Sequence, residues 1–226
     1  RLAPRNPDLV VLERHPKHGQ ETSSRNSEVI HGGMYYPEGS LKARLCVEGN
    51  RAIYEICEAH AIPHKRCGKL ITATEAGELP ALDRILALGT ANGVEMHRMS
   101  AAEALALEPN IRSAGALFSP NTGVVSAHGL MDYFFHQAIA AGAVFQPRSE
   151  LVGIERGRDG YRLSVRAGGA TESFTTERVV NAAGLEADTI SALAGIDVDA
   201  AGYRLHYCKG SYFSVASSKA GLVSRL

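Results

Sequence analysis

The chain has 226 residues, 45% of them hydrophobic, and its 24 Lys and Arg residues balance 24 Asp and Glu residues. At roughly 100–200 residues per domain, this length fits one large domain or two small ones with a buried core. The zero net charge argues against general nucleic-acid binding and against a polybasic membrane anchor, since both need an excess of basic residues. No stretch of the sequence approaches the roughly 18 apolar residues of a membrane-spanning helix.

Four cysteines occur, and no two of them form a CxxC pair. Cys46 and Cys57 lie on one predicted helix, where they would not face each other as a disulfide requires. His60 and His64 have no CxxC pair beside them with which to bind zinc. We therefore predict reduced thiols, no metal site and a cytoplasmic location.

The first predicted element is a strand over 9–12, because four consecutive apolar residues suit a strand buried on both faces of a parallel sheet. Residues 14–39 are rich in Gly, Ser, Asn and Pro and predict a loop with a short helix. Apolar residues at helical spacing, an N-cap at Ser40 and a capping box beginning at Ser100 then predict helices. These helices cover 41–60, 75–92 and a short stretch after Ser100, and a strand is predicted over 69–74.

The second half of the chain predicts more strands. A strand and turn are expected over 115–126, followed by a helix over 128–142. Asp159-Gly160 lies between alternating apolar runs, which is a good hairpin signal. The predicted elements after this helix are short strands over 151–154, 161–166 and 172–175, a buried strand over 179–184, a helix over 186–194 and an alternating strand over 203–215.

Glu13 ends the first apolar run. In a doubly wound nucleotide-binding fold, an acidic residue at the end of the second strand binds the ribose hydroxyls. The alternative is a strand that happens to end in a solvated Glu. The glycine fingerprint of such a fold would lie some 20 residues earlier, before Arg1, and no GxGxxG occurs elsewhere in the sequence.

Two further segments have residues suited to a flat, phosphate-bearing ligand. Residues 22–27 gather hydroxyls, an amide and a guanidinium that can bind phosphate or ring carbonyls, and two glycines follow His31. The alternative is a polar surface loop with turn glycines. Residues 178–184 predict a strand that ends in small residues, where a cofactor could approach closely; the alternative is a tight strand–helix turn.

The motifs LVVLE, TSSRNS, VIHGGMYYP, GKLI and VVNAAGL occur in this order. With them, the chain resembles the flavin-dependent oxidoreductases of the D-amino acid oxidase superfamily, and within it the L-2-hydroxyglutarate dehydrogenase/oxidase branch. The resemblance runs from Leu9 to about Tyr212. A similar Ser-rich stretch before His-Gly-Gly occurs in flavin-linked glycerol-3-phosphate dehydrogenases, so the motif indicates FAD more specifically than it indicates the substrate.

The resemblance implies an α/β fold, α+β overall, in which a Rossmann-like FAD-binding domain is interleaved with a mixed-sheet substrate domain. The implied FAD-binding domain covers 1–60 and 140–200, and the substrate domain covers 61–139 and 201–226. Both would be incomplete, as in a fragment of a longer flavoprotein. We expect this segment alone not to bind FAD tightly, because the helix N-terminus that binds the pyrophosphate would precede it.

The resemblance also implies roles for individual residues. His31 would lie at the flavin face as the candidate catalytic base, because an unperturbed histidine titrates near neutrality. The alternative is a histidine that orders the loop or bonds the flavin. The residues implied to bind FAD are Glu13, Ser23, Ser24, Arg25, Asn26, Gly32, Val152, Ala182, Ala183 and Gly184.

A substrate carboxylate would bind Arg204, Lys209 and Tyr212, unless these residues only form an exposed strand face. The branch has Arg where this chain has Lys209, so a carboxylate clamp there would keep a point charge and lose the bidentate fork. The branch often has Asp where this chain has Ser126.

The implied reaction is oxidation of a small 2-hydroxy acid, with hydride transfer to flavin and removal of the hydroxyl proton by a base. One alternative is a flavin amine oxidase acting on glycine or another amino acid, and another is a non-catalytic remnant of the fold. The electron acceptor, oxygen or quinone, is left open.

Overall fold

The computed structural model describes residues 2–226, which divide into two compact units. The first unit contains the residues up to Asn26 together with Met131–Ser211, and the second contains Ser27–Leu130 together with Tyr212–Leu226. These boundaries differ from the predicted ones, since residues 27–60 belong to the second unit. The assignment of FAD binding to one domain and substrate binding to the other stays a prediction.

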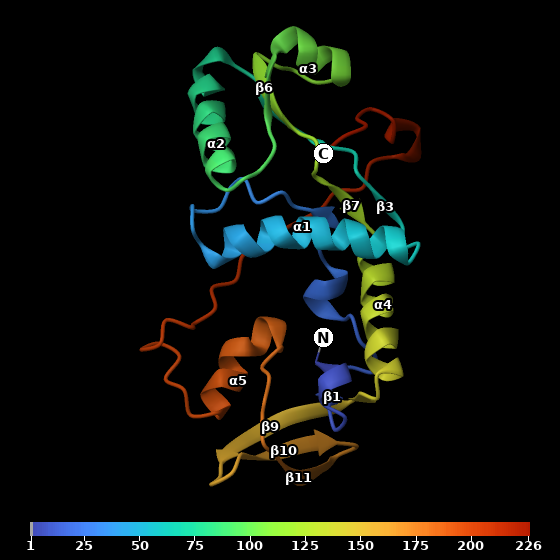
Figure 1. Ribbon diagram of the computed structural model, residues 1–226, viewed down its shortest axis with the longest axis vertical. Coiled ribbons are helices and arrows are strands. Elements are labelled where there is room, and N and C mark those ends of the chain that lie inside the picture. The colour runs from blue at the N-terminus through green and yellow to red at the C-terminus, as the bar shows by residue number, and fades with distance from the viewer. Residues whose placement is uncertain (1) are drawn as a thin grey trace. The chain divides into compact units, whose positions relative to one another are not determined.

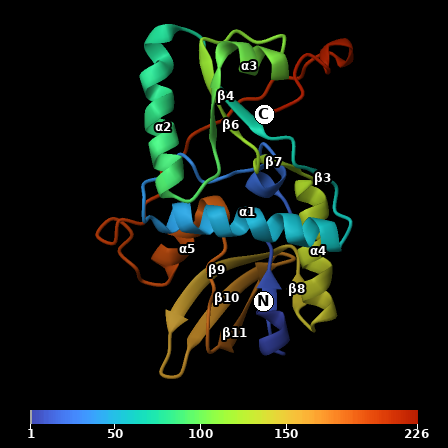
Figure 2. The same cartoon turned by 45° about the horizontal axis from the view of Figure 1, so that its top comes forward.

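The first unit contains a short parallel pair and an antiparallel sheet (Figure 2). Strands β1 (Val10–Leu12) and β8 (Val144–Gln146) run parallel. Strands β9 (Ser149–Arg156), β10 (Tyr161–Ala167) and β11 (Ala170–Thr176) form an antiparallel meander, which confirms the hairpin predicted at Asp159-Gly160. The remaining elements of this unit are helix α5 (Ala187–Leu193) and the 3₁₀ helices η1 (Ala3–Arg5), η2 (Glu21–Ser24) and η4 (Gly184–Glu186).

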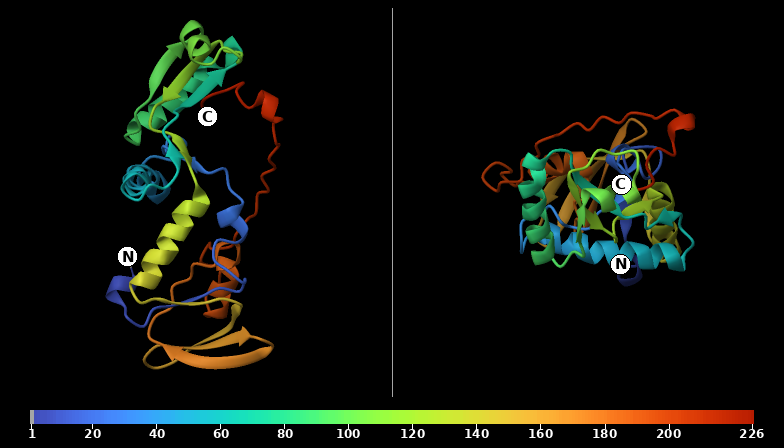
Figure 3. Two further views of the ribbon diagram at one scale, coloured as in Figure 1. Left: turned by 90° about the vertical axis from the view of Figure 1, so that its right-hand side faces the viewer. Right: turned by 90° about the horizontal axis from the view of Figure 1, so that it is seen from above.

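The second unit contains two antiparallel three-stranded sheets. One has the order β2 (Val29–Ile30), β7 (Gly123–Val125), β3 (His64–Lys65). The other has the order β4 (Lys69–Ala73), β6 (Gly115–Ser119), β5 (His97–Ser100). The C-terminal residues return to this second sheet, where Leu226 exchanges backbone hydrogen bonds with Gly68 and Leu70 (Figure 3).

The helices of the second unit follow the predicted local signals. Helix α1 (Leu41–Ala59) begins after Ser40, whose side chain accepts a hydrogen bond from the Ala43 N–H. Helix α3 (Ala101–Leu107) begins with the predicted Ser100–Glu103 capping box. Helix α2 (Leu79–Ala91) follows the 3₁₀ turn η3 (Ala76–Glu78) and packs Leu82 against Ala73 and Leu117 of the β4–β6–β5 sheet (Figure 1). Helix α4 (Ala127–Ala140) begins in this unit and ends in the first, and the 3₁₀ helix η5 (Ser217–Lys219) lies near the C-terminus.

Three strand predictions need correction. Within the predicted 9–12, Val10–Leu12 form the parallel strand β1, but Val10 and Val11 are exposed, because β8 is the only described strand that pairs with β1. Residues 179–183 form no strand, and Val180 is exposed. Residues 203–215 are irregular and exposed rather than an alternating strand. A segment forms a strand only where a neighbouring strand offers hydrogen bonds, and no described strand pairs with either segment.

All four cysteines are free thiols. Across residues 2–226, no His, Cys, Asp and Glu side chains gather in a group of three or more that would hold a metal ion. No helix in the described part of the chain combines the length and hydropathy needed to cross a membrane.

Candidate functional site

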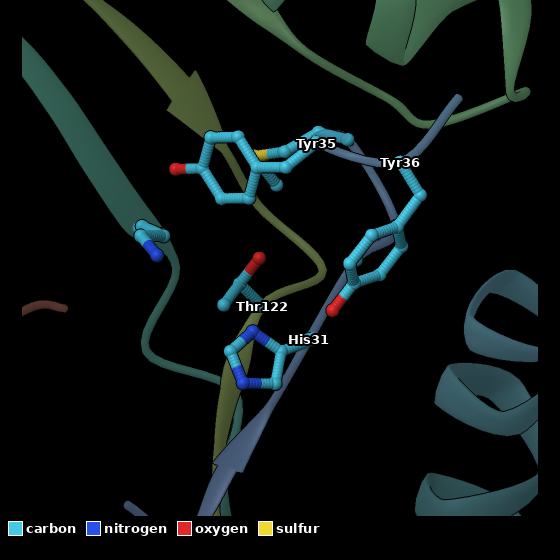
Figure 4. A pocket seen from close by; sticks show the side chains of 8 residues that line it. His31, Tyr35, Tyr36 and Thr122 are labelled. Carbon is cyan, nitrogen blue, oxygen red and sulfur yellow. The ribbon is translucent and has the colours of Figure 1, made fainter. Parts of the chain in front are cut away.

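A shallow surface recess in the second unit is lined by His31, the predicted catalytic base. Most of its lining comes from one segment, residues 31–36, and the rest comes from Lys69 at the start of β4 and from Thr122 before β7. In the close view, Thr122 lies between the His31 ring and Tyr35, and the hydroxyl of Tyr36 points toward His31 (Figure 4).

Two asparagine side chains position the lining segment. Asn50 of α1 donates hydrogen bonds to the carbonyl oxygens of His31 (3.0 Å) and Asn121 (2.9 Å), which fixes His31 beside the turn that contains Thr122. Asn92, at the end of α2, donates to the carbonyl oxygens of Gly33 (3.1 Å) and Tyr36 (2.8 Å). Because these bonds join elements far apart in the sequence, the recess depends on tertiary packing.

The two glycines after His31 serve the packing of this segment. Gly33 has a φ of +95°, in the region that favours glycine, and a Cβ there would lie 3.0 Å from Val47. A Cβ on the buried Gly32 would lie 3.1 Å from the end of the Met34 side chain. The structure therefore accounts for both glycines by chain geometry, and close approach of a cofactor to Gly32 stays a prediction.

The environment of His31 lowers the pKa of its imidazole below the ordinary value of 6.5. The largest cause is partial burial of the ring, followed by the positive charges of Lys69 and Lys42. The neutral imidazole therefore predominates at neutral pH, and it has one ring nitrogen free to accept a proton. This is the protonation state that a general base requires.

Tyr35 and Lys69 form the far wall of the recess. Partial burial raises the pKa of the Tyr35 phenol and lowers the pKa of the Lys69 ammonium. The Lys69 Nζ lies 5.2 Å from the centroid of the Tyr35 ring, within cation–π range. Tyr35 thus keeps its proton at neutral pH and can donate a hydrogen bond.

The predicted FAD-binding residues near the N-terminus lie in the first unit. Glu13 follows β1, and its Oε1 accepts the backbone N–H of His15 at 2.8 Å. Ser23 and Ser24 lie in η2, and Arg25 and Asn26 follow it with exposed side chains. Residues 21–26 therefore form a short polar turn that follows β1 in the chain.

Arg14 joins three of the segments that were predicted to bind the cofactor. Its guanidinium pairs with Glu21, the first residue of η2, and lies 3.7 Å from Glu186 in η4. The hydrogen bond from Arg14 is the main cause that lowers the pKa of the Glu21 carboxyl, and His15 adds to it. Arg14 therefore brings the loop after Glu13, the Ser-rich turn and the Gly184 turn together within the first unit.

Two other predicted cofactor contacts have distinctive backbones. The register between β9 and β10 skips Val152, so this residue is the extra one of a β-bulge. Gly184 has a φ of +58°, and a Cβ built on it meets nothing within 4 Å. Ala182 is exposed and Ala183 half-buried. The backbone at Gly184 is therefore open to a ligand.

The predicted carboxylate-binding residues are not assembled into a clamp. Arg204 forms a bidentate pair with Asp199, with distances of 2.9 and 2.6 Å. Lys209 and Tyr212 lie in the exposed, irregular segment, and Tyr212 belongs to the second unit. A substrate carboxylate would have to displace Asp199 to bind Arg204.

Sequence reasoning missed several lining residues of the recess, namely Lys69, Tyr35, Tyr36 and Thr122. Lys69 lies within the GKLI motif and the tyrosines within HGGMYYP, so the motifs contained them without indicating a role. It also missed Arg14, which directly follows Glu13.

The comparisons with known proteins decide the family. A family model described as FAD dependent oxidoreductase, the DAO family, matches residues 1–225. The chain belongs to this family. It is also 32% identical over 261 residues to an Arabidopsis thaliana protein named L-2-hydroxyglutarate dehydrogenase, mitochondrial, and the match covers 100% of this chain and 52% of that protein.

Two solved structures share the fold. The L-alpha-glycerophosphate oxidase of Mycoplasma pneumoniae, solved with FAD bound, has a TM-score of 0.78 and 24% identity over 86% of this chain and 53% of that chain. The glycine oxidase of Geobacillus kaustophilus has a TM-score of 0.74 and 25% identity over 87% of this chain and 54% of that chain. These structural matches confirm the predicted α/β fold class, the family match confirms the FAD-dependent family, and the chain spans about half the length of these relatives.

The donor set of the first unit fits the family's cofactor. No described residue donates a hydrogen bond to the Glu13 Oε2, which leaves it as an acceptor for ribose hydroxyls. The Ser-rich turn exposes the hydroxyl of Ser23 and the guanidinium of Arg25, which are donors suited to phosphate. A Cβ built on Gly184 meets nothing within 4 Å, so there is space for a ligand beside Gly184 itself.

Proposed function

We propose that the full-length protein oxidises a small 2-hydroxy acid of the L-2-hydroxyglutarate type to the 2-oxo acid, with FAD as hydride acceptor. The observation that carries the proposal is the recess in which a neutral His31 lies beside a lysine and a tyrosine that keeps its proton. The name of the Arabidopsis thaliana relative supports the substrate class.

His31 acts as the general base in this proposal. As the substrate C–H bond breaks, a ring nitrogen of His31 takes the proton of the substrate hydroxyl, and a carbonyl forms. FAD, when bound, would supply the hydride acceptor for that carbon. The Tyr35 hydroxyl can donate to the substrate oxygen while the proton leaves. Asn50 keeps His31 in place through the His31 carbonyl oxygen.

The residues that hold FAD in this proposal are those that the resemblance implies. Glu13 binds the adenosine ribose, and Val152 contacts the adenine side through its backbone. The residues that line the pyrophosphate and the flavin ring are Ser23, Ser24, Arg25, Asn26, Gly32, Ala182, Ala183 and Gly184. Arg204, Lys209 and Tyr212 contribute to carboxylate binding, Arg204 only after Asp199 releases it.

Anaerobic mixing of the FAD-loaded full-length protein with L-2-hydroxyglutarate tests the proposal. We expect the flavin absorbance to bleach as the cofactor is reduced, with formation of 2-oxoglutarate in equal amount. An unchanged flavin spectrum with every 2-hydroxy acid tried would contradict it. Reoxidation by oxygen or by a quinone then identifies the acceptor, and fractionation of cells tests the predicted cytoplasmic location.

The likeness to a glycine oxidase favours amine oxidation as the second candidate. An amino acid is oxidised as the neutral amine, so a dedicated base is less needed. Bleaching by glycine or another amino acid, without bleaching by hydroxy acids, would decide for it. A full-length protein that stays colourless after incubation with FAD would instead indicate a non-catalytic remnant of the fold.

A further inference from the structure

Lys69 is a half-buried cation with no carboxylate partner among residues 2–226. It is the first residue of β4, where it pairs with Ser119 of β6, and its side chain lines the His31 recess. None of the ion pairs formed within residues 2–226 includes Lys69. Its nearest aromatic contact is the Tyr35 ring, which supplies only a weak attraction.

This arrangement has a free-energy cost. Partial burial disfavours the charged ammonium of Lys69, which its lowered pKa reflects. A buried charge is ordinarily paired, because desolvation is otherwise uncompensated. A charge left unpaired in a recess beside a candidate base is therefore a group suited to binding an anion from solution.

The rest of the recess also lacks negative charge. Its lining residues include no Asp or Glu. A second lysine, Lys42 of α1, lies 4.5 Å from the centroid of the Tyr36 ring, so each tyrosine of the lining segment has a lysine over its face. Both lysines lower the pKa of His31, which places their positive charge within electrostatic reach of the imidazole.

We propose that Lys69 binds a carboxylate of the substrate in the His31 recess and thereby presents the substrate hydroxyl to His31. This inference rests on the proposed function and adds to it a substrate-binding residue. The Tyr35 ring face lies near the ammonium, and Thr122 lies between Tyr35 and the His31 ring. A ligand with two carboxylates gains most from this site, because the exposed Lys42 beside Tyr36 offers a second positive charge nearby.

The experiment compares Lys69→Met, Lys69→Arg and Lys65→Met in the FAD-loaded full-length protein. Lys65→Met is the matched control, since Lys65 is an exposed lysine on β3 that does not line the recess. Glutarate, which has two carboxylates and no hydroxyl to oxidise, is titrated while the flavin absorbance is followed. Stopped-flow reduction by L-2-hydroxyglutarate then gives an apparent dissociation constant and a limiting rate.

We expect Lys69→Met to raise both dissociation constants about tenfold or more, with a much smaller change in the limiting rate. Lys69→Arg should restore part of the affinity, and Lys65→Met should change nothing. Reduction by 2-hydroxybutyrate, which has only the carboxylate next to the hydroxyl, distinguishes two binding modes. If Lys69→Met weakens binding of 2-hydroxybutyrate equally, Lys69 binds the carboxylate next to the hydroxyl. If Lys69→Met weakens binding of the dicarboxylates alone, Lys69 binds the remote carboxylate.

Unchanged glutarate binding in Lys69→Met would overturn the inference, as would a loss confined to the limiting rate. Because glutarate binding requires no turnover, this result is separate from the fate of the proposed function. A full-length protein that binds glutarate through Lys69 but oxidises no hydroxy acid would reject only the proposed reaction.

Discussion

Glu108 and Lys69 are two charged side chains of the second unit, and they differ in whether the fold supplies each with a partner. Glu108 is only 4% exposed, and its carboxylate accepts hydrogen bonds from the N–H and hydroxyl of Ser224 and from the Arg225 guanidinium. Lys69 is half-buried and has no carboxylate partner within the described chain. A charge that the fold satisfies contributes to stability, whereas one that it leaves unsatisfied is available to a ligand. The variants below test this difference.

The largest effect on the rate is expected at His31, the base to which Lys69 is proposed to present the substrate. His31→Ala removes the base but leaves Lys69 in place, so flavin reduction by the hydroxy acid should slow by about 10²–10³-fold. Glutarate binding should change little. Anaerobic stopped-flow absorbance measures the rate, and an undiminished rate would show that His31 only orders the loop.

Glu108→Gln should destabilise the protein without affecting catalysis. It leaves the donors of Ser224 and Arg225 poorly matched, and we expect the free energy of unfolding to fall by about 1–3 kcal/mol. Glu55→Gln, on the exposed face of α1, is the control. Denaturant unfolding of the full-length protein provides the measurement, and equal stability of the two variants would contradict this role of Glu108.

The same carboxylate makes stability depend on acid. Hydrogen bonds from Ser224, with those from Arg225, hold the pKa of Glu108 below its usual value. A depressed pKa in the folded state means that the stabilisation is present above the unfolded-state pKa of about 4.3 and is lost as the pH falls through the folded-state value. The difference in stability between the native protein and Glu108→Gln should therefore shrink below about pH 4.

Lys69→Met should change the free energy of unfolding in the direction opposite to Glu108→Gln. Removing an unpaired, half-buried ammonium relieves its desolvation, so the free energy of unfolding should stay equal or rise by up to about 1 kcal/mol. A variant that binds glutarate more weakly and yet is no less stable would separate the two kinds of buried charge. Marked destabilisation by Lys69→Met would instead assign Lys69 a structural role.

The smallest effect concerns the acid limb of the pH profile. His31 must be neutral to act as a base, so the rate should fall as the pH drops through its lowered pKa. Lys69 contributes to this lowering, so its replacement by Met should raise the pKa of His31 and move the acid limb of kcat/KM to higher pH. The Lys65→Met profile should coincide with that of the native protein.

Features set by neighbouring residues were predictable from the sequence. The Ser40 N-cap, the Ser100–Glu103 capping box and the hairpin at Asp159-Gly160 all formed as expected. Each depends on groups only a few residues apart, so a short pattern specifies it. The resemblance motifs likewise indicated the FAD-dependent family, which the family match confirms.

The strands predicted over 179–184 and 203–215 failed because their pattern says nothing about a partner. β10 alternates as residues 203–215 do, but it has β9 on one side and β11 on the other. Hydrophobic alternation is a property of one segment, whereas a strand is a property of two.

The sequence by itself therefore determined the caps, the hairpin, the family and His31 as the candidate base. Only the tertiary structure decided which residues surround His31. Asn50 reaches Asn121 across 71 residues, and β4 places Lys69 beside a segment more than 30 residues earlier. Such contacts are formed by packing of helices and sheets, and no local pattern indicates whether a lysine there meets a carboxylate or is left unpaired.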